Sequence, residues 1–223
     1  METPFFSYCL IIIAFLLYLI VSYLYKILNV NNLEKALQKS NGLTFLNLRH
    51  SVGILLFGVS FLCLHIEYVE LLTIFNHFSF NIVLISLILI ILTVLISRSS
   101  VKKTILNINY NNRVYIGNGL LYFIVRSIFL LSYEFFFRGV LLFTLIDLFG
   151  LVLAIIINTL LYVLIHAFDS KAEIIGAIPF GIVLCLLSYY SESIVLPFII
   201  HLSLSLVYEV SLFNFFKSIK SQS

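Results

Sequence analysis

Charged residues are scarce in this chain of 223 residues: only 10% are Asp, Glu, Lys or Arg, whereas 62% are hydrophobic. A soluble domain is about a quarter charged and about half apolar, so the composition excludes an ordinary soluble domain. The mean hydropathy of +1.15 instead indicates an integral membrane protein with several spans. The small net charge of +3 does not indicate nucleic-acid binding, and the partner that we expect is membrane lipid.

Several motifs of metal, redox and protease chemistry are also missing. Cys9, Cys63 and Cys185 stand apart in apolar stretches, which excludes a zinc knuckle and a dithiol redox pair; we interpret them as small buried hydrophobes. Without an H-E-x-x-H sequence, the chain lacks the ligands of a site-2-type zinc protease. It also lacks G-x-S-x-G and a serine–histidine arrangement of the rhomboid type.

Long apolar stretches dominate what is present. A helical span needs roughly 20 apolar residues, and the stretches that qualify are 5–25, 50–68, 79–97, 117–149, 151–168, 173–190 and 193–216. We therefore predict an all-α fold: a polytopic membrane helical bundle of about seven transmembrane helices (six to eight), with residues 1–223 as a single integral membrane domain. The sequence NNLEKALQK predicts a short surface helix, and 98–118 is predicted to be a polar connector.

The fourth stretch is too long for one simple span. As a straight helix, residues 117–149 would extend roughly 50 Å, against a hydrocarbon core of about 30 Å. We expect this segment to tilt, to extend beyond the bilayer or to break, with Gly139 as the flexible point. A hairpin there would reverse the orientation of everything that follows.

Basic residues between the spans predict the orientation. They follow the first span, the third span and the last span: Lys26, Lys35, Lys39, Arg49, Arg98, Lys102, Lys103, Arg113, Lys217 and Lys220. Loops rich in Lys and Arg stay in the cytoplasm. Seven spans with the N-terminus outside and the C-terminus cytoplasmic satisfy this rule, and we expect a bacterial plasma membrane.

Two charged residues lie within the fourth stretch, where Glu134 precedes Arg138 by one helical turn. A charge at the centre of a transmembrane helix costs about 2.5–3.5 kcal/mol on insertion scales. At this spacing the two side chains can pair with each other, or both can face a polar cavity. The pair alone does not separate a structural role from a functional one.

Two histidines change that balance. His166 follows Tyr162 by one turn near the end of the fifth span, and His201 precedes Ser205 by one turn in the last span. Polar residues on three helices avoid lipid best by facing one another, so we expect them to form one site with Glu134.

Such a site can hydrolyse an amide without a covalent nucleophile. A carboxylate and a neutral imidazole can deprotonate a water, while a second imidazole and a hydroxyl stabilise an oxyanion. Arg138 can hold Glu134 ionised and oriented. The catalytic candidates are therefore Glu134, Arg138, His166, His201 and Ser205. No cofactor is required, although two His and a Glu can also hold zinc, which we rank second.

These residues resemble the motifs of the CPBP family of CAAX-protease and bacteriocin-processing intramembrane proteases. The motifs read YEFFFRG at 133–139, YVLIH at 162–166 and HLSLS at 201–205, and the resemblance covers about 117–210. It implies an intramembrane endopeptidase acting near the cytoplasmic face. His166 would activate water with a glutamate, His201 would donate to the oxyanion, and the substrate would be a peptide or membrane protein.

The chain departs from the family pattern at two positions. Tyr133 stands where the family has its first glutamate, and Ser205 stands where Asn or Asp is usual. Neighbouring helix positions point about 100° apart, so Glu134 does not simply replace the missing carboxylate. The alternative is a non-catalytic member that acts as a bacteriocin self-immunity or membrane scaffold protein. A small transporter is a third class, although matching halves with broken helices are missing.

Other polar residues received simpler interpretations. We expect Arg126 to snorkel to the cytoplasmic surface rather than to cap the pocket. His50, His65 and His77 are expected near interfaces, with exposed or snorkelling side chains. Asp147 and Glu209 are predicted to mark helix ends.

Overall fold

The computed structural model describes residues 4–64, 66–72, 79–108 and 113–221, so His65 and His77 lie outside the described residues. All regular elements within these ranges are helices, and seven segments are long and apolar enough to cross a membrane. The predicted all-α, polytopic bundle is therefore confirmed. The spans are α1 (Pro4–Ile27), α3 to α4 (Gly42–Leu64), α5 (Phe80–Leu106), α6 to α7 (Gly119–Phe149), α8 (Leu151–Ile165), α9 (Lys171–Ser191) and α10 (Val195–Lys220).

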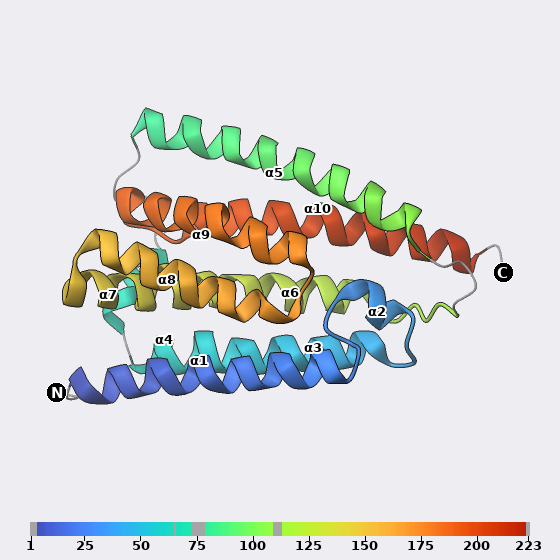
Figure 1. Cartoon of the computed structure of the whole chain (residues 1–223), viewed down its shortest axis with the longest axis horizontal. Coiled ribbons are helices and arrows are strands. Elements are labelled where there is room, and N and C mark those ends of the chain that lie inside the picture. Colours follow the sequence, from blue (N-terminus) through green and yellow to red (C-terminus); the bar gives the residue numbers. More distant parts are fainter. Residues whose placement is uncertain (1–3, 65, 73–78, 109–112, 222–223) are drawn as a thin grey trace.

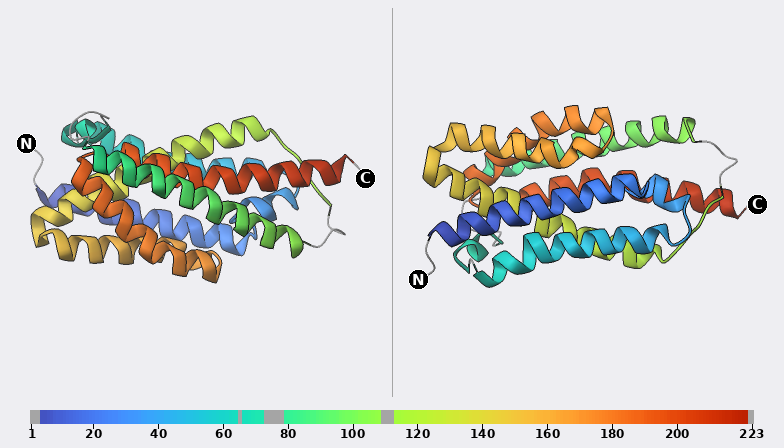
Figure 2. Two further views of the ribbon diagram at one scale, coloured as in Figure 1. Left: turned by 90° about the horizontal axis from the view of Figure 1, so that it is seen from above. Right: turned by 60° about the horizontal axis from the view of Figure 1, so that its bottom comes forward.

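The spans run antiparallel along the long axis, and the two chain ends lie at opposite ends of the bundle (Figure 1). Helices α6 and α10 are central neighbours, α5 packs on the outer side of α10, and α8 packs on α7 and α9. The two further views in Figure 2 show the same elongated bundle from other sides. Residues from α6, α8, α9 and α10 can thus meet inside the molecule.

Side-chain caps begin three of these helices. Asn118 accepts a hydrogen bond from the Leu121 amide at 3.1 Å at the start of α6, and Ser79 and Ser170 do the same for α5 and α9. Each cap satisfies an amide that has no partner within its own helix. The cap at Asn118 fixes where α6 begins, and therefore where Glu134 lies at its end.

The second and third spans are longer than predicted. The second begins at Gly42 rather than 50, and α5 continues to Leu106, so 98–106 is helix and not connector. The polar part of α5 is held by α10: the Ser97 hydroxyl donates to the Leu204 carbonyl at 2.6 Å, and Thr104 bonds Tyr208 at 3.0 Å. The predicted surface helix is present as α2 (Leu33–Leu37), with its apolar residues buried.

The overlong fourth stretch remains one span, and the hairpin considered for it does not form. Its α-helical pattern is interrupted by a π-helical segment, η3 (Phe135–Leu141), which contains Gly139. This segment separates α6 (Gly119–Glu134) from α7 (Leu142–Phe149). A second π segment, η1 (Ile54–Val59), lies against it, with the rings of Phe57 and Phe136 stacked 4.4 Å apart. Such widened turns are frequent at functional sites.

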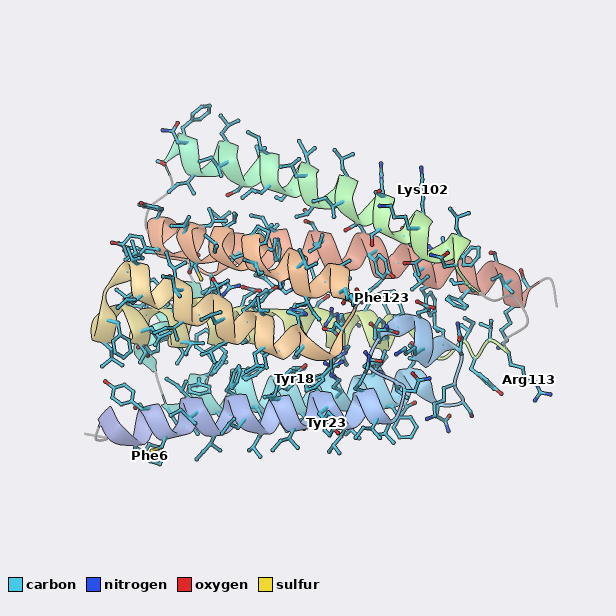
Figure 3. All side chains as sticks on the ribbon, in the orientation of Figure 1. Phe6, Tyr18, Tyr23, Lys102, Arg113 and Phe123 are labelled. Carbon is cyan, nitrogen blue, oxygen red and sulfur yellow. The ribbon has the colours of Figure 1, made fainter. Side chains whose placement is uncertain are left out.

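The basic side chains that do not lie inside the bundle are found toward the end of the molecule that carries the C-terminus. Lys102 and Arg113 mark that end in Figure 3, whereas Phe6 marks the opposite one. Lys26, Lys217 and Lys220 lie in the last turns of α1 and α10, at this same end. The bundle therefore has one strongly basic end.

Candidate active site

The centre of the site is a carboxylate–imidazole pair between α6 and α10. The Nδ1 of His201 lies 2.5 Å from Oε1 of Glu134, and the Glu134 side chain is completely buried. Glu134 Oε2 lies 3.4 Å from Nε of Arg138, which is also completely buried. An arginine stays protonated in proteins and a carboxylate oxygen is an acceptor, so this contact is made when Nδ1 of His201 donates its hydrogen to Glu134.

Arg138 is held by residues that the sequence analysis did not single out. Its Nη1 donates to Asn158 Oδ1 at 2.5 Å, and the amide of Asn158 donates to the Phe137 carbonyl at 2.7 Å. Ser188 on α9 donates to the Arg138 carbonyl at 2.9 Å. The signal in the sequence was an Asn in the middle of an apolar stretch, because an intramembrane polar residue is expected to have a partner.

The aromatic ring of Tyr162 joins the two histidines. Its centroid lies 5.0 Å from the ring of His166, 6.5 Å from the ring of His201 and 4.6 Å from the guanidinium carbon of Arg138. His166 and His201 therefore both lie beside the ring of Tyr162, although His166 follows the end of α8 and His201 lies within α10. The structure brings Glu134, Arg138, His166 and His201 into one cluster.

His166 has a carboxylate partner of its own. It lies in a short 3₁₀ turn, η4 (His166–Phe168), at the end of α8, and its Nδ1 is 2.9 Å from Oδ2 of Asp169. The sequence analysis missed Asp169, whose spacing of three residues from His166 places both in one turn. Nε2 of His166 is buried and has no hydrogen-bond partner among the residues that the structure describes.

Within the described ranges, several other polar atoms around Tyr162 are buried without a hydrogen bond. Besides His166 Nε2, they are Tyr133 Oη, Glu134 Oε2, Arg138 Nε and Nη2, and Thr159 Oγ1. The ring of Tyr133 meets those of Tyr162 and His201 edge-on, at 5.9 and 6.0 Å. Buried polar groups in native proteins are nearly always bonded to protein or water, so this cluster is suited to hold a polar ligand.

His201 presents the accessible edge of the central pair. Its side chain is 10% exposed, whereas that of Glu134 is 0% exposed. Among the described residues, its Nε2 has no hydrogen-bond partner. When Nδ1–H is donated to Glu134, Nε2 carries the lone pair of the neutral imidazole, and a carboxylate-oriented imidazole of this kind can accept a proton from water.

Ser205 lies outside this pair. Its hydroxyl donates to Glu209 Oε1 at 3.1 Å and accepts from Arg126 Nη2 at 3.0 Å. Arg126 Nε also donates to Glu209 Oε1 at 3.1 Å, and the Tyr122 hydroxyl donates to Glu209 Oε2 at 2.9 Å. These four residues, which we call the Arg126–Glu209 cluster, connect α6 with α10 on the basic side of the central pair.

This cluster corrects two sequence interpretations. Arg126 does not snorkel to the surface, because Glu209 and Ser205 hold its guanidinium inside the bundle. Glu209 does not mark a helix end: α10 continues to Lys220, and the carboxylate of Glu209 is bonded within the bundle. His50 is also not exposed, since its ring stacks 4.9 Å from that of Phe129. Asp147 does lie exposed near the end of α7, as expected.

The cysteines differ from one another. Cys185 is buried as expected, with its sulfur 3.5 Å from Nη1 of Arg138, but Cys63 is exposed and Cys9 is half-buried. In the described part of the chain, no group of three or more His, Cys, Asp or Glu side chains is placed to hold a metal ion. Two surface cavities, of about 440 and 360 Å³, are lined by other residues than the site candidates.

Comparison with known proteins agrees with the three motifs. Residues 115–207 match the family described as type II CAAX prenyl endopeptidase Rce1-like, a branch of the CPBP proteases. No curated protein and no solved structure matches the chain. The matched segment includes Glu134, His166 and His201, and it lies within the multi-pass bundle. Residues 115–207 of this chain are therefore similar to the Rce1-like family.

Proposed function

We propose that the protein is an intramembrane endopeptidase that hydrolyses a peptide bond with a water activated by the Glu134–His201 pair. The observation that carries this proposal is the 2.5 Å contact between the buried carboxylate and Nδ1 of His201. It leaves Nε2 of His201 as the base. The family match adds the reaction class and, from the family's description, a prenylated CAAX tail as the first substrate to test.

In this proposal the proton of the attacking water is transferred by His201 to the leaving nitrogen. A water between His201 and the substrate gives a proton to Nε2 and attacks the scissile carbonyl carbon. Glu134 stabilises the resulting imidazolium, as a carboxylate does beside a catalytic histidine. The imidazolium then returns the proton to the leaving nitrogen as the C–N bond breaks.

Two groups around the base can donate to the developing oxyanion. Within the described residues the Tyr133 hydroxyl is a buried donor with no hydrogen-bond partner. His166 donates from Nε2 only as an imidazolium, whose Nδ1–H is held by the Asp169 carboxylate. Donors held in a dry site stabilise such a charge far better than in water. In this mechanism Tyr133 supplies a hydrogen bond where the family pattern has a glutamate, and Ser205 is not needed as a donor.

The test is hydrolysis by the purified full-length protein in lipid nanodiscs. Farnesylated peptides that end in a Cys-a-a-X tail are incubated in ¹⁸O-water, and products are analysed by mass spectrometry. Glu134→Gln and His201→Gln are expected to lower turnover by about 100- to 10,000-fold. Glu173→Gln, a change of an exposed residue at the start of α9, is the matched control. Equal turnover in all four proteins would contradict the proposal.

A non-catalytic member remains the second candidate, favoured by Tyr133 in place of the first glutamate. Such a protein would bind a partner in the membrane, as a bacteriocin self-immunity or scaffold protein does, without cleaving it. Tyr133→Glu separates the two proposals. Hydrolysis that appears only in this variant would support the non-catalytic protein, whereas hydrolysis by the unchanged chain would support the enzyme.

We also propose that the basic end of the bundle is cytoplasmic and that the N-terminus lies outside, in a bacterial plasma membrane. The support is the collection of lysines and arginines at the end with the C-terminus, since basic loops remain inside. Labelling of single cysteines by an impermeant maleimide in whole cells tests this orientation. Reagent added outside should reach Phe6→Cys and should not reach Ser218→Cys.

A further inference from the structure

The Arg126–Glu209 cluster repeats the spacing of the central pair. Arg126 precedes Glu134 by eight residues on α6, and Glu209 follows His201 by eight residues on α10. Because these helices are antiparallel, Arg126 meets Glu209 at the same register in which Glu134 meets His201. The two polar contacts lie about 12 Å apart along the helix axes at a rise of 1.5 Å per residue.

The polar residues of α10 form one stripe toward α6. His201, Ser205 and Glu209 recur every four residues, which keeps them on one side of the helix. The opposite contacts of α10 go to α5, where Ser203 bonds Thr93 at 2.7 Å. Helix α10 is thus attached by separate polar contacts to two neighbours, and only the contacts with α6 lie in line with the catalytic histidine.

The environment makes such polar contacts decisive for register. In lipid, apolar side chains gain little by leaving the acyl chains, so helix position depends on close packing and on hydrogen bonds between helices. The Arg126–Glu209 cluster supplies three such hydrogen bonds at 2.9–3.1 Å, and a fourth, from Ser205 to Glu209, lies within α10. The Glu134–His201 contact is a single point between α6 and α10 and does not by itself fix the rotation of α10 against α6.

We propose that Arg126 and Glu209 are positioning residues, which fix the register of α10 against α6 and thereby hold His201 Nδ1 on Glu134. This inference rests on the proposed function for its catalytic consequence, but its structural part does not. Neither residue touches the reacting atoms: both act through the placement of α10. Ser205 belongs to this positioning cluster, because its hydroxyl hydrogen is directed to Glu209.

The decisive variant replaces both charges together. Removing one partner leaves an unpaired buried charge, whereas replacing an ion pair by apolar residues of similar size is often neutral for stability. Arg126→Met with Glu209→Leu is therefore expected to fold with an unchanged or higher melting temperature. Its turnover of the farnesylated peptide is expected to fall about 100-fold, as for a catalytic group displaced by about 1 Å, with KM changed less than about 3-fold.

A second readout does not require activity. The ¹⁵N signals of His201 in bilayers report which ring nitrogen carries hydrogen, and the described contact predicts hydrogen on Nδ1. In the double variant this signal is expected to broaden or to change to Nε2–H. Thr93→Val with Ser203→Ala, which removes one hydrogen bond between α5 and α10, is the matched control and is expected to keep the wild-type His201 signal.

Each outcome decides the proposal. A double variant with wild-type turnover and His201 signal would overturn it, as would a control pair that shifts the signal equally. If the double variant does not fold, Arg126→Lys replaces it: a lysine cannot reproduce the two-sided guanidinium contact, and turnover should fall about 10-fold. If no protein hydrolyses the peptide, the proposed function fails, while the ¹⁵N comparison still tests the positioning.

Discussion

The two polar contacts between α6 and α10 differ in how completely their polar atoms are hydrogen-bonded. In the Arg126–Glu209 cluster the two carboxylate oxygens, the serine hydroxyl and the tyrosine hydroxyl all have partners. Around the Glu134–His201 pair, by contrast, polar atoms of Tyr133, Glu134, Arg138 and His166 are buried without hydrogen bonds to the described residues, although Glu134 Oε2 and Arg138 Nε form an ion pair at 3.4 Å. A saturated cluster suits a structural or positioning role, whereas unsatisfied groups suit a site that binds a polar substrate.

Burial separates the same two regions. The side chains of Glu134 and Arg138 are 0% exposed, whereas those of Arg126 and Glu209 are 19% and 11% exposed. Charges in the drier region depend more strongly on each other, because less water is available to replace a lost partner. Equivalent mutations are therefore expected to change stability and activity by different amounts in the two regions.

Removal of the carboxylate should be most harmful at Glu134. Glu134→Leu leaves the completely buried Arg138 without its counter-ion and is expected to destabilise the fold by about 3–5 kcal/mol. Glu209→Leu leaves a partly exposed arginine and should cost less. Chemical unfolding in a fixed detergent, followed by circular dichroism, measures both. Equal losses would mean that the difference in burial has no energetic consequence.

The support of Arg138 gives the next largest effect. Asn158→Leu removes the acceptor of Arg138 and the donor to the Phe137 carbonyl, and is expected to cost about 1–3 kcal/mol. Thr159→Val alters the neighbouring residue on α8, whose buried hydroxyl has no hydrogen-bond partner, and should leave stability unchanged. Thermal unfolding of the two variants side by side provides the comparison. A larger loss in Thr159→Val would contradict the described contacts.

Two tyrosines allow one chemical change to be made in both regions. Tyr122→Phe removes a hydroxyl that donates to Glu209 and should cost about 1 kcal/mol. Tyr133→Phe removes an unpartnered hydroxyl, so stability should not fall, but turnover should decrease by about 100-fold if the hydroxyl donates to the oxyanion. Unfolding curves and hydrolysis rates on the same preparations test both halves. Unchanged turnover in Tyr133→Phe would remove Tyr133 from the mechanism.

Ser205 should show the smallest effect. Ser205→Ala removes two hydrogen bonds of a partly exposed cluster, and turnover is expected to stay within about 3-fold of wild type because Arg126 and Glu209 still contact each other directly. Measured kcat and KM for this variant separate the two interpretations of Ser205. A loss of about 100-fold in kcat would return Ser205 to the oxyanion role implied by the family motif.

The helical bundle and its spans could be predicted well from the sequence. A lipid bilayer requires spans of a certain length and apolar composition, and both can be read from one sequence. The sequence also predicted that Glu134, Arg138, His166 and His201 meet, since charged and polar groups avoid acyl chains. The errors concerned partners. Arg126 and Glu209 were each explained alone, although they contact each other across 83 positions of sequence. Asn158 and Asp169 were missed because their importance depends on the neighbours that folding brings to them.

The central claim is that Glu134 orients His201 so that Nε2 is the base. The most direct measurement is the ¹⁵N spectrum of His201 in the resting protein in bilayers, compared with Glu134→Gln. We predict that the wild-type ring carries hydrogen on Nδ1 with an unprotonated Nε2, and that this preference is lost in the variant. A wild-type ring with hydrogen on Nε2 and a bare Nδ1, or an identical spectrum in Glu134→Gln, would contradict the account.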